Sequence, residues 1–268
     1  MFSAIKLVVA AATLCGAMSA ASPALAATAS LPVGALLAIP NPNLRTVKIA
    51  IDSATGVEAA LFRVQYNRSI AVATQVRKTA ITNACAIEVN TANPNNEVQI
   101  SMACTNPLTG GGALFEIDFA GVNPGLSNLT FLECNLNEGT PSCQVSNGTL
   151  RVTTCALDVD ANGSAAANTD GVYIFRSLPP TLQTVVPTAF RQLIPGIPLD
   201  PVILDNVNTV LTLMNVDGKG TTQASTDGVY IFRSLSNLQT VVPPLFRQLD
   251  PTIPSDQAIG ANVDALCP

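Results

Sequence analysis

The feature that most constrains this chain is a segment that occurs twice in its C-terminal half. The nine residues DGVYIFRSL begin at Asp170 and recur unchanged from Asp227, and the shorter strings LQTVVP and FRQL also occur twice downstream. Similarity at a nearly constant offset indicates that one supersecondary unit has been duplicated. The sequence therefore predicts a domain over residues 155–267 that consists of two repeats, 157–213 and 214–266.

Oxygen-bearing side chains stand at alternate positions just before the first identical run. The segment reads DVDANGS, and a further aspartate follows at the start of the predicted helix. Alternate residues of a tight loop can direct their oxygens to one point, and calcium takes roughly six to eight oxygen ligands. The glycine permits the sharp turn that such a loop needs. The predicted ligands are Asp158, Asp160, Asn162, Asp170 and, through its backbone carbonyl, Ser164.

The second repeat carries a weaker version of the same loop. Lys219 stands at the fifth position, where an ammonium group cannot ligate calcium and its charge opposes the ion. The predicted ligands are Asn215, Asp217, Thr221 and Asp227. We therefore expect calcium as the cofactor, with one strong site in the first repeat and one weaker site in the second. An ordinary polar turn is the alternative for a lone loop, and the duplication favours calcium over it.

Short helices are predicted after each loop. Val172, Phe175 and Leu178 share one face at helical spacing, and their counterparts in the second repeat do the same. Further helices are expected over residues 202–214 and 257–266. Prolines at 179, 180 and 187, and at 243 and 244, are expected to end the first helix of each repeat and to form extended connectors.

Residues 27–153 have the pattern of β-strands rather than helices. Apolar and polar side chains alternate over 47–51, 62–66 and 113–119, and clusters of Asn, Pro and Gly separate the strand segments. Further strands are expected near 98–102, 129–132 and 149–152. Many short strands with frequent turns indicate an antiparallel sandwich. The alternation places Glu116 and Asp118 on the solvent side of their strand.

Composition excludes several classes of function. The chain has no histidine, which removes Ser-His-Asp triads, Cys-His pairs and every histidine-ligated zinc site. Basic residues do not cluster, so nucleic acid is not an expected partner. A glycosidase would need two convergent carboxyl groups, and the acidic residues of the first half show no such signature. We therefore expect a protein that is not an enzyme.

The N-terminal residues have the pattern of an export signal. Lys6 is the only charged residue in 1–26, an apolar run follows it, and Ala24-Leu25-Ala26 offers a cleavage site. We predict a signal peptide over residues 1–26, cleavage after Ala26 and a secreted or cell-surface protein. An uncleaved anchor is the alternative, although the apolar run is short for a membrane span of about 20 residues. We expect no other transmembrane segment.

Six cysteines remain after the predicted cleavage site. An even number in an exported chain suggests disulfides, although spacing alone does not fix which cysteines pair. The pairs that we expect are Cys85–Cys104, Cys134–Cys143 and Cys155–Cys267. The last pair would join the two ends of the repeat domain.

The paired loops of the form D-x-[DN]-x-[DN]-G, each leading into a short helix that ends R-x-L, resemble the dockerin family. The resemblance implies a small, mainly α calcium-loop domain that depends on calcium to fold and that binds cohesins. It places the ligands on the residues already named. Two features depart from the family. The closing aspartate lies one residue later than in the usual loop, and each repeat is about twice as long.

The first half resembles a cohesin domain through three segments in the expected order. Residues 56–67 lead into a Y-N-x-S turn, residues 111–119 contain G-x-L-x-x-I-x-F, and residues 147–152 read NGTLRV. The resemblance implies an all-β sandwich of the jelly-roll type, which carbohydrate-binding modules share, and a role in binding dockerins.

Together these features predict a secreted, non-catalytic adaptor of extracellular polysaccharide-degrading or cell-surface assemblies. Its expected partners are proteins that carry dockerins or cohesins, including copies of itself in a head-to-tail arrangement. The alternative is a carbohydrate-binding module, with polysaccharide as its ligand, attached to a calcium-stabilised anchor. That alternative is less favoured because sugar sites usually stack on exposed aromatic rings, and the first half has no tryptophan and one tyrosine, Tyr66.

Overall fold

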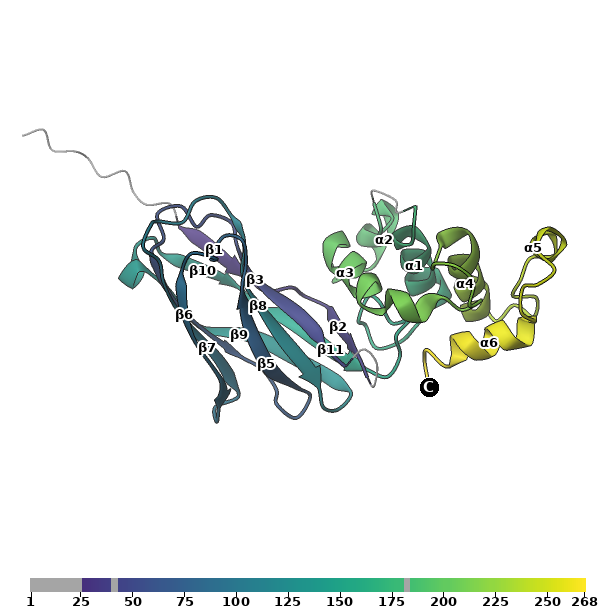
Figure 1. The fold of residues 1–268 in the computed structure, drawn as a ribbon, viewed down its shortest axis with the longest axis horizontal. Coiled ribbons are helices and arrows are strands. Elements are labelled where there is room, and N and C mark those ends of the chain that lie inside the picture. Colours follow the sequence, from purple (N-terminus) through teal and green to yellow (C-terminus); the bar gives the residue numbers. More distant parts are fainter. Residues whose placement is uncertain (1–25, 40–42, 181–183) are drawn as a thin grey trace, which may run out of the picture.

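The computed structural model describes residues 26–39, 43–180 and 184–268. These residues form a β-sandwich followed by a smaller helical domain that lies beside one end of it (Figure 1). The predicted signal peptide falls outside the described residues, apart from Ala26. The helices of the described ranges are too short or too polar to cross a lipid bilayer.

The sandwich consists of two sheets. One has the strand order β10-β1-β3-β8-β5 and the other the order β2-β11-β9-β4-β7-β6. The strands are β1 (Ala27–Ser30), β2 (Ala35–Ala38), β3 (Arg45–Ile51), β4 (Ala59–Gln65), β5 (Ala71–Lys78), β6 (Ala86–Asn93), β7 (Glu97–Ala103), β8 (Gly112–Gly121), β9 (Gly125–Leu136), β10 (Cys143–Ser146) and β11 (Gly148–Thr153). A short 3₁₀ turn, η1 (Asn137–Gly139), follows β9.

The first two strands, β1 and β2, belong to different sheets. β1 pairs in parallel with β10, and β2 pairs in parallel with β11, while the other strand pairs are antiparallel. The predicted sandwich is therefore present, although its sheets are mixed rather than purely antiparallel. β2 was not expected because its sequence ALLA is buried throughout and shows no alternation.

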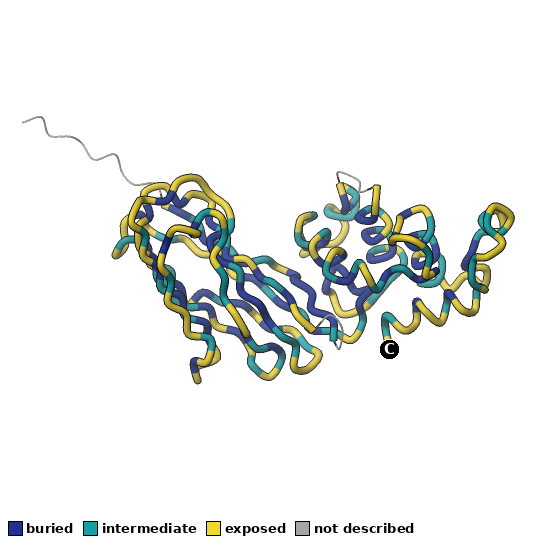
Figure 2. Tube along the Cα trace, viewed as in Figure 1, coloured by how far each residue is buried: buried dark blue, intermediate teal, exposed yellow. Residues whose placement is uncertain are grey.

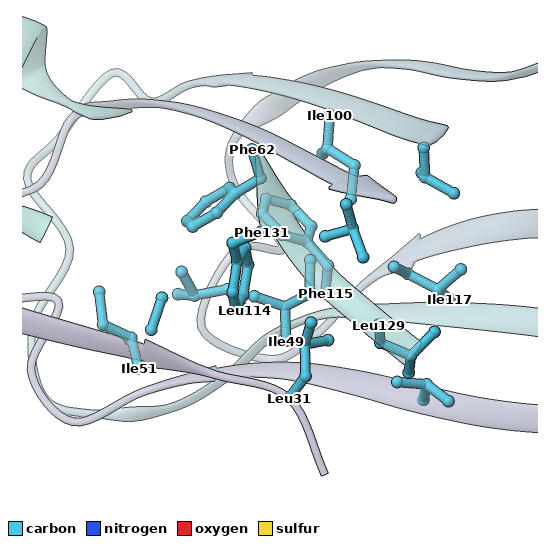
Figure 3. Close-up of a cluster of buried hydrophobic side chains, with 14 of the residues drawn as sticks. Leu31, Ile49, Ile51, Phe62, Ile100, Leu114, Phe115, Ile117, Leu129 and Phe131 are labelled. Atoms are coloured by element: carbon cyan, nitrogen blue, oxygen red, sulfur yellow. The ribbon is translucent and has the colours of Figure 1, made fainter. Parts of the chain in front are cut away.

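Apolar side chains from both sheets meet in one core (Figure 3). Figure 2 shows that buried residues lie along the strands of both sheets. Phe62 of β4 packs edge-on against Phe115 of β8, with ring centroids 5.9 Å apart. Tyr66 packs in the same way against Phe119 at 5.2 Å. Each large side chain that is fully buried stabilises the fold by roughly 1.5–3 kcal/mol. The alternation that predicted the strands is the alternation that fills this core.

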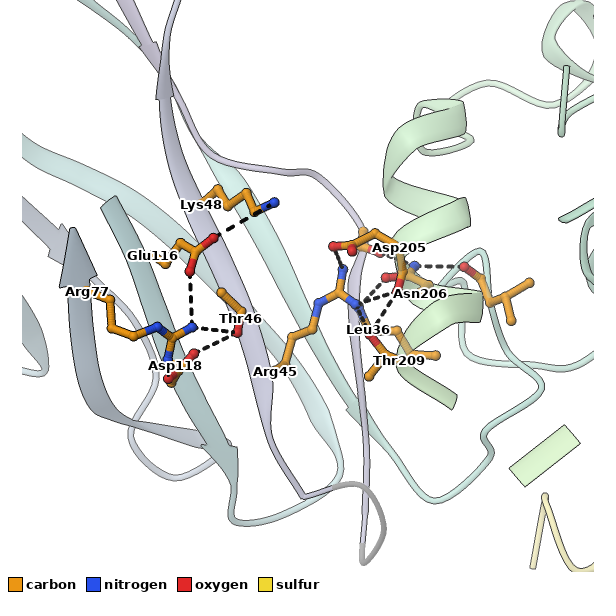
Figure 4. Close-up of polar contacts among 12 residues, drawn as sticks. Leu36, Arg45, Thr46, Lys48, Arg77, Glu116, Asp118, Asp205, Asn206 and Thr209 are labelled. Atoms are coloured by element: carbon orange, nitrogen blue, oxygen red, sulfur yellow. Dashed lines mark hydrogen bonds and ion pairs between the residues drawn. The ribbon is translucent and has the colours of Figure 1, made fainter. Parts of the chain in front are cut away.

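The expectation for Asp118 was wrong. Asp118 is only 3% exposed. Its carboxylate pairs with Arg77 of β5 and accepts a hydrogen bond from Thr46 Oγ1 at 2.6 Å. Strands lie on both sides of β8, and the arginine side chain covers the carboxylate (Figure 4). Glu116 also pairs with Arg77, at 3.1 Å, and with Lys48 at 4.0 Å. The two carboxylates therefore belong to a ladder of ion pairs across three strands.

The helical domain repeats one set of elements twice. The first repeat contains η2 (Ala167–Gly171), α1 (Val172–Ser177), α2 (Thr188–Leu193), α3 (Asp200–Val210) and η3 (Leu211–Met214). The second contains η4 (Ala224–Gly228), α4 (Val229–Leu235), α5 (Pro244–Leu249) and α6 (Asp256–Asp264). Both repeats contribute to a second core, separate from that of the sandwich. Tyr173 and Tyr230 are the largest fully buried side chains of this second core.

Two helices occupy the segments that were expected to be extended connectors. Pro187 directly precedes α2, and Pro244 is the first residue of α5. Proline suits the start of a helix because its φ is preset and its missing N–H is not needed there. Each helix is also held by an aromatic contact, Phe190 with Tyr173 and Phe246 with Tyr230, at 6.2 Å in both repeats.

The six cysteines are joined in the three expected pairs, Cys85–Cys104, Cys134–Cys143 and Cys155–Cys267. The last disulfide closes a loop with a sequence separation of 112 residues around the helical domain. In the chain-entropy model a loop of this length stabilises the folded state by ~4–5 kcal/mol.

The first repeat packs against the sandwich through α3 (Figure 4). The side chain of Asn206 accepts a hydrogen bond from the Leu36 amide at 3.0 Å and donates one to the Gly34 carbonyl at 2.8 Å. Arg45 of β3 donates to the Asp205 carbonyl at 2.9 Å and pairs with the Asp205 carboxylate at 2.8 Å. A Cβ on Gly34 would lie 2.4 Å from Pro198, so the close approach requires glycine at this position.

Candidate metal centre

Three carboxylates of the first repeat converge at one point. Asp158, Asp160 and Asp170 each place one oxygen within 4.8 Å of the other two, and all three residues are buried. The first two lie in the loop that precedes η2, and the third lies within η2. The alternating pattern in the sequence therefore identified a real cluster of oxygen donors, from residues that are up to twelve positions apart.

Backbone amides of the loop hold these carboxylates in place. The amides of Asn162 and Gly163 donate to Asp158 at 3.0 Å, and the Asn162 amide also donates to Asp160 at 3.0 Å. Gly163 has a φ of 107°, a left-handed conformation that favours glycine. The loop is thus folded around its acidic side chains through its own N–H groups.

The additional residue in the loop is absorbed by a π-helical turn. In η2 the Gly171 amide donates to the Ala166 carbonyl, five residues earlier, at 3.1 Å. A π turn holds one residue more than an α turn, so Asp170 still faces the other two carboxylates although it lies one position late. Its oxygens accept from the amides of Asp160 at 3.1 Å and Ala166 at 2.9 Å. The second repeat has the same turn, in which the Gly228 amide donates to the Gln223 carbonyl at 3.0 Å.

Burial of these acids raises their pKa values. Burial and then the charge of Asp160 raise the pKa of Asp170 to about 7 and the pKa of Asp158 to about 6. Burial also raises the pKa of Asp160. No salt bridge within the described ranges reaches any of the three carboxylates. A hard divalent cation would neutralise this charge and would find only oxygen ligands, so the donor set fits calcium.

The other two predicted ligands of this loop lie at its exposed rim. Asn162 Oδ1 accepts from both the amide and the hydroxyl of Ser164, at 3.0 Å each. Their roles as ligands remain predictions.

The second loop brings together two carboxylates and one amide. Asp217 and Asp227 are buried, and Asn215 and Asp217 both accept a hydrogen bond from the Lys219 amide, at 3.1 and 2.9 Å. Asp227 accepts from the amides of Asp217 at 3.5 Å and Gln223 at 3.0 Å, as Asp170 does at the matching positions, and also from the Val216 amide at 2.9 Å. Thr221 is exposed, and ligation by any of the four predicted residues remains a prediction.

The ammonium group of Lys219 has an ion-pair partner outside the loop. It pairs with the Asp250 carboxylate at 2.6 Å, and the hydrogen bond to Lys219 lowers the pKa of Asp250 to about 2. The first repeat has Ile194 at the position that corresponds to Asp250, and Asn162 at the position of Lys219. The ion pair is thus specific to the second repeat; the sequence pointed to Lys219, but its partner Asp250 was not predicted.

Two residues outside the predicted set connect the first loop to the sandwich. Arg151 of β11 donates to the Ala161 carbonyl at 2.6 Å, and Asn206 of α3 donates to the Val159 carbonyl at 2.8 Å. The duplication could have indicated the Asn206 contact, because an asparagine stands at the same position in both repeats. In the second repeat Asn262 donates to the equivalent carbonyl, that of Val216, at 2.8 Å. No sequence signal pointed to Arg151.

Comparisons with known proteins find similarity only at the level of solved structures. No family model matches the chain, and no curated protein matches it. A non-cellulosomal cohesin from Archaeoglobus fulgidus aligns at 16% identity and a TM-score of 0.41, over 48% of this chain and 92% of the cohesin. CaCohA2 from Clostridium acetobutylicum aligns at 20% identity and 0.40, over 48% and 91%. A Clostridium thermocellum cohesin–dockerin complex, Coh-OlpC-Doc435, contains a chain that aligns at 10% identity and 0.42, over 49% and 96%.

Proposed function

We propose that this chain is a secreted, non-catalytic adaptor that binds other proteins through a cohesin-like sandwich and a calcium-dependent, dockerin-like domain. The observation that carries the proposal is the convergence of three buried carboxylates, Asp158, Asp160 and Asp170, with no salt bridge to them among the described residues. Buried carboxylates that stay ionised need a compensating positive charge. The cohesin-like segments of the sequence support the assignment of the sandwich.

The arrangement of the domains leaves a surface of the helical domain open to a partner. The domain contacts its own sandwich through α3 and the first calcium loop. Phe175 of α1 and Phe232 of α4 are not among these contact residues. Their side chains remain 39% and 37% exposed. The proposed partners are proteins that bear cohesins or dockerins, and a second copy of this chain is one of them.

The alternative, a carbohydrate-binding module, has less support in the structure. All five aromatic side chains of the described sandwich are buried in its core, which leaves no exposed ring on which a sugar could stack. Binding to a glycan array at low concentration would favour this alternative.

The proposal is tested by calcium titration and thermal melting of the chain that begins at Ala27. We expect a strong and a weaker binding event in calorimetry, and a higher melting temperature in calcium than in chelator. A second experiment measures mass against concentration with and without calcium, and captures immobilised cohesins and dockerins. Identical melting curves in both buffers would remove the basis of the proposal.

A further inference from the structure

Each repeat buries one tyrosine hydroxyl that has no hydrogen-bond partner among the described residues. Tyr173 and Tyr230 are fully buried, and the hydroxyl of each is unpaired. A buried polar group without a hydrogen-bond partner destabilises the folded state. The two tyrosines occupy the same position in the duplicated run, three residues after the aspartate that closes each loop. An equivalent unpaired group in both copies indicates a partner that is common to both.

The surroundings of the two hydroxyls are the ion loops. Tyr230 lines a cavity of about 410 Å³ together with Asp217 and Thr221 of the second loop. After burial, the charges of Asp217 and then Asp227 raise the pKa of Tyr230 to about 12. In the first repeat the equivalent aspartates, Asp160 and Asp170, contribute to the same rise for Tyr173, also to about 12.

The rings themselves are fixed by packing. Tyr173 meets Phe190 of α2 and Tyr230 meets Phe246 of α5, in edge-on contacts of the same geometry. This packing holds the phenol groups beside the loops. The longer repeat unit supplies these helices, since α2 and α5 lie within the segment between the first and last helices of each repeat.

We propose that the Tyr173 and Tyr230 hydroxyls belong to the two ion sites, where each donates a hydrogen bond to the aspartate at the third loop position, Asp160 or Asp217, once calcium orients that carboxylate. The inference rests on the proposed binding of calcium. A carboxylate accepts about four hydrogen bonds or ligand contacts, so Asp160 can bind an ion and accept from the phenol as well as from Asn162. A hydrogen bond from O–H to a charged carboxylate is strong and fixes its orientation. The tyrosines are positioning residues and not ligands.

Calcium affinity of matched variants tests the proposal. Tyr173→Phe and Tyr230→Phe each remove one hydroxyl and keep the ring, and Tyr66→Phe in the sandwich core is the control. We expect Tyr173→Phe to weaken the stronger site about tenfold, Tyr230→Phe to weaken the other by a similar factor, and Tyr66→Phe to change neither. Unchanged dissociation constants at both sites would overturn the role of the tyrosines.

A spectroscopic measurement separates this inference from the proposed function. The chain has no tryptophan and three tyrosines, so its near-ultraviolet absorption reports on tyrosine. Calcium should shift the tyrosine absorption of the Tyr66→Phe variant and leave that of the Tyr173→Phe/Tyr230→Phe double variant unchanged. Terbium bound in the loops should emit when tyrosine is excited in the Tyr66→Phe variant.

The two possible failures give different results. A wild-type chain that shows neither heat of calcium binding nor terbium emission contradicts calcium binding itself. A wild-type chain that binds calcium with no change in tyrosine absorption contradicts only the tyrosine role, and this measurement holds even if a phenylalanine variant does not fold.

Discussion

Asp158, Asp160 and Asp170 should determine how the folded state responds to pH and, if the proposed site binds calcium, to that ion. Without an ion, burial and the charge of Asp160 hold the pKa of Asp158 at about 6 and that of Asp170 at about 7, above the ordinary value of 3.8. A carboxyl group whose pKa is higher in the folded state stabilises that state while it is protonated. This contribution is complete below the unfolded pKa and is lost as the pH rises through the folded pKa.

Without calcium, the helical domain should therefore become less stable as the pH rises from about 4 to about 7. The proposed calcium ion would bind the ionised carboxylates, so its stabilising effect should grow over the same range. The measurement is the melting temperature in chelator and in calcium at a series of pH values. A calcium effect of constant size across that series would contradict the assignment of the buried acids as ligands.

Matched substitutions isolate the first site in the same experiment. Asp170→Asn removes the charge with little change in shape and should abolish the stronger binding event and flatten the pH dependence in chelator. Asp227→Asn is the control in the second repeat and should leave the stronger event in place. Loss of the stronger event in both variants would show that the two loops do not bind independently.

At the level of the elements, the sequence predicted what depends on local pattern. Alternation gave β3, β4 and β8, and the spacing of oxygens gave the converging carboxylates of the first loop. β6 was missed because five of its eight residues are exposed without regular alternation. The π turn was not predicted, because its hydrogen bonds depend on how Asp170 packs against the loop. The direction of Lys219 depends on Asp250, which lies 31 residues later.

The second loop should become a stronger site when its lysine is replaced by the residue of the first loop. Lys219→Asn supplies an oxygen ligand and removes a positive charge, so we expect the weaker event to tighten about tenfold. Lys219→Met removes the charge without supplying oxygen and should give a smaller gain. Calorimetry on both variants checks the order, and equal gains would mean that charge alone limits the site.

At the level of the whole molecule, the sandwich and the first repeat form a continuous unit. The contacts of Arg45 with Asp205 and of Leu36 with Asn206 join residues 160 and 170 positions apart, which no local pattern can reveal. Asn206 is fully buried, whereas Asn262 at the equivalent position is exposed. The difference arises because the sandwich covers the first repeat at this position.

Asn206→Ala should destabilise the protein more than Asn262→Ala. The first substitution removes hydrogen bonds to Leu36, Gly34 and Val159 and leaves the buried groups unpaired, at a cost on the order of 2–4 kcal/mol. The second removes one bond at an exposed residue, at a cost of about 1 kcal/mol. Denaturant unfolding checks the difference, and hydrogen exchange at the Leu36 amide should accelerate only in Asn206→Ala.

Calcium in the first loop should also stabilise the contact between the domains. The loop carbonyls of Val159 and Ala161 accept from Asn206 and Arg151, so an ion that orders the loop also fixes two acceptors of the interface. Asn206 in turn holds the Leu36 amide, whose exchange rate therefore reports on the ion. Addition of a chelator should accelerate that exchange in the wild type and in Asp227→Asn. In Asp170→Asn the exchange should be fast in both buffers. A Leu36 amide that exchanges at one rate with and without calcium would mean that the domains meet through contacts that the loop does not control.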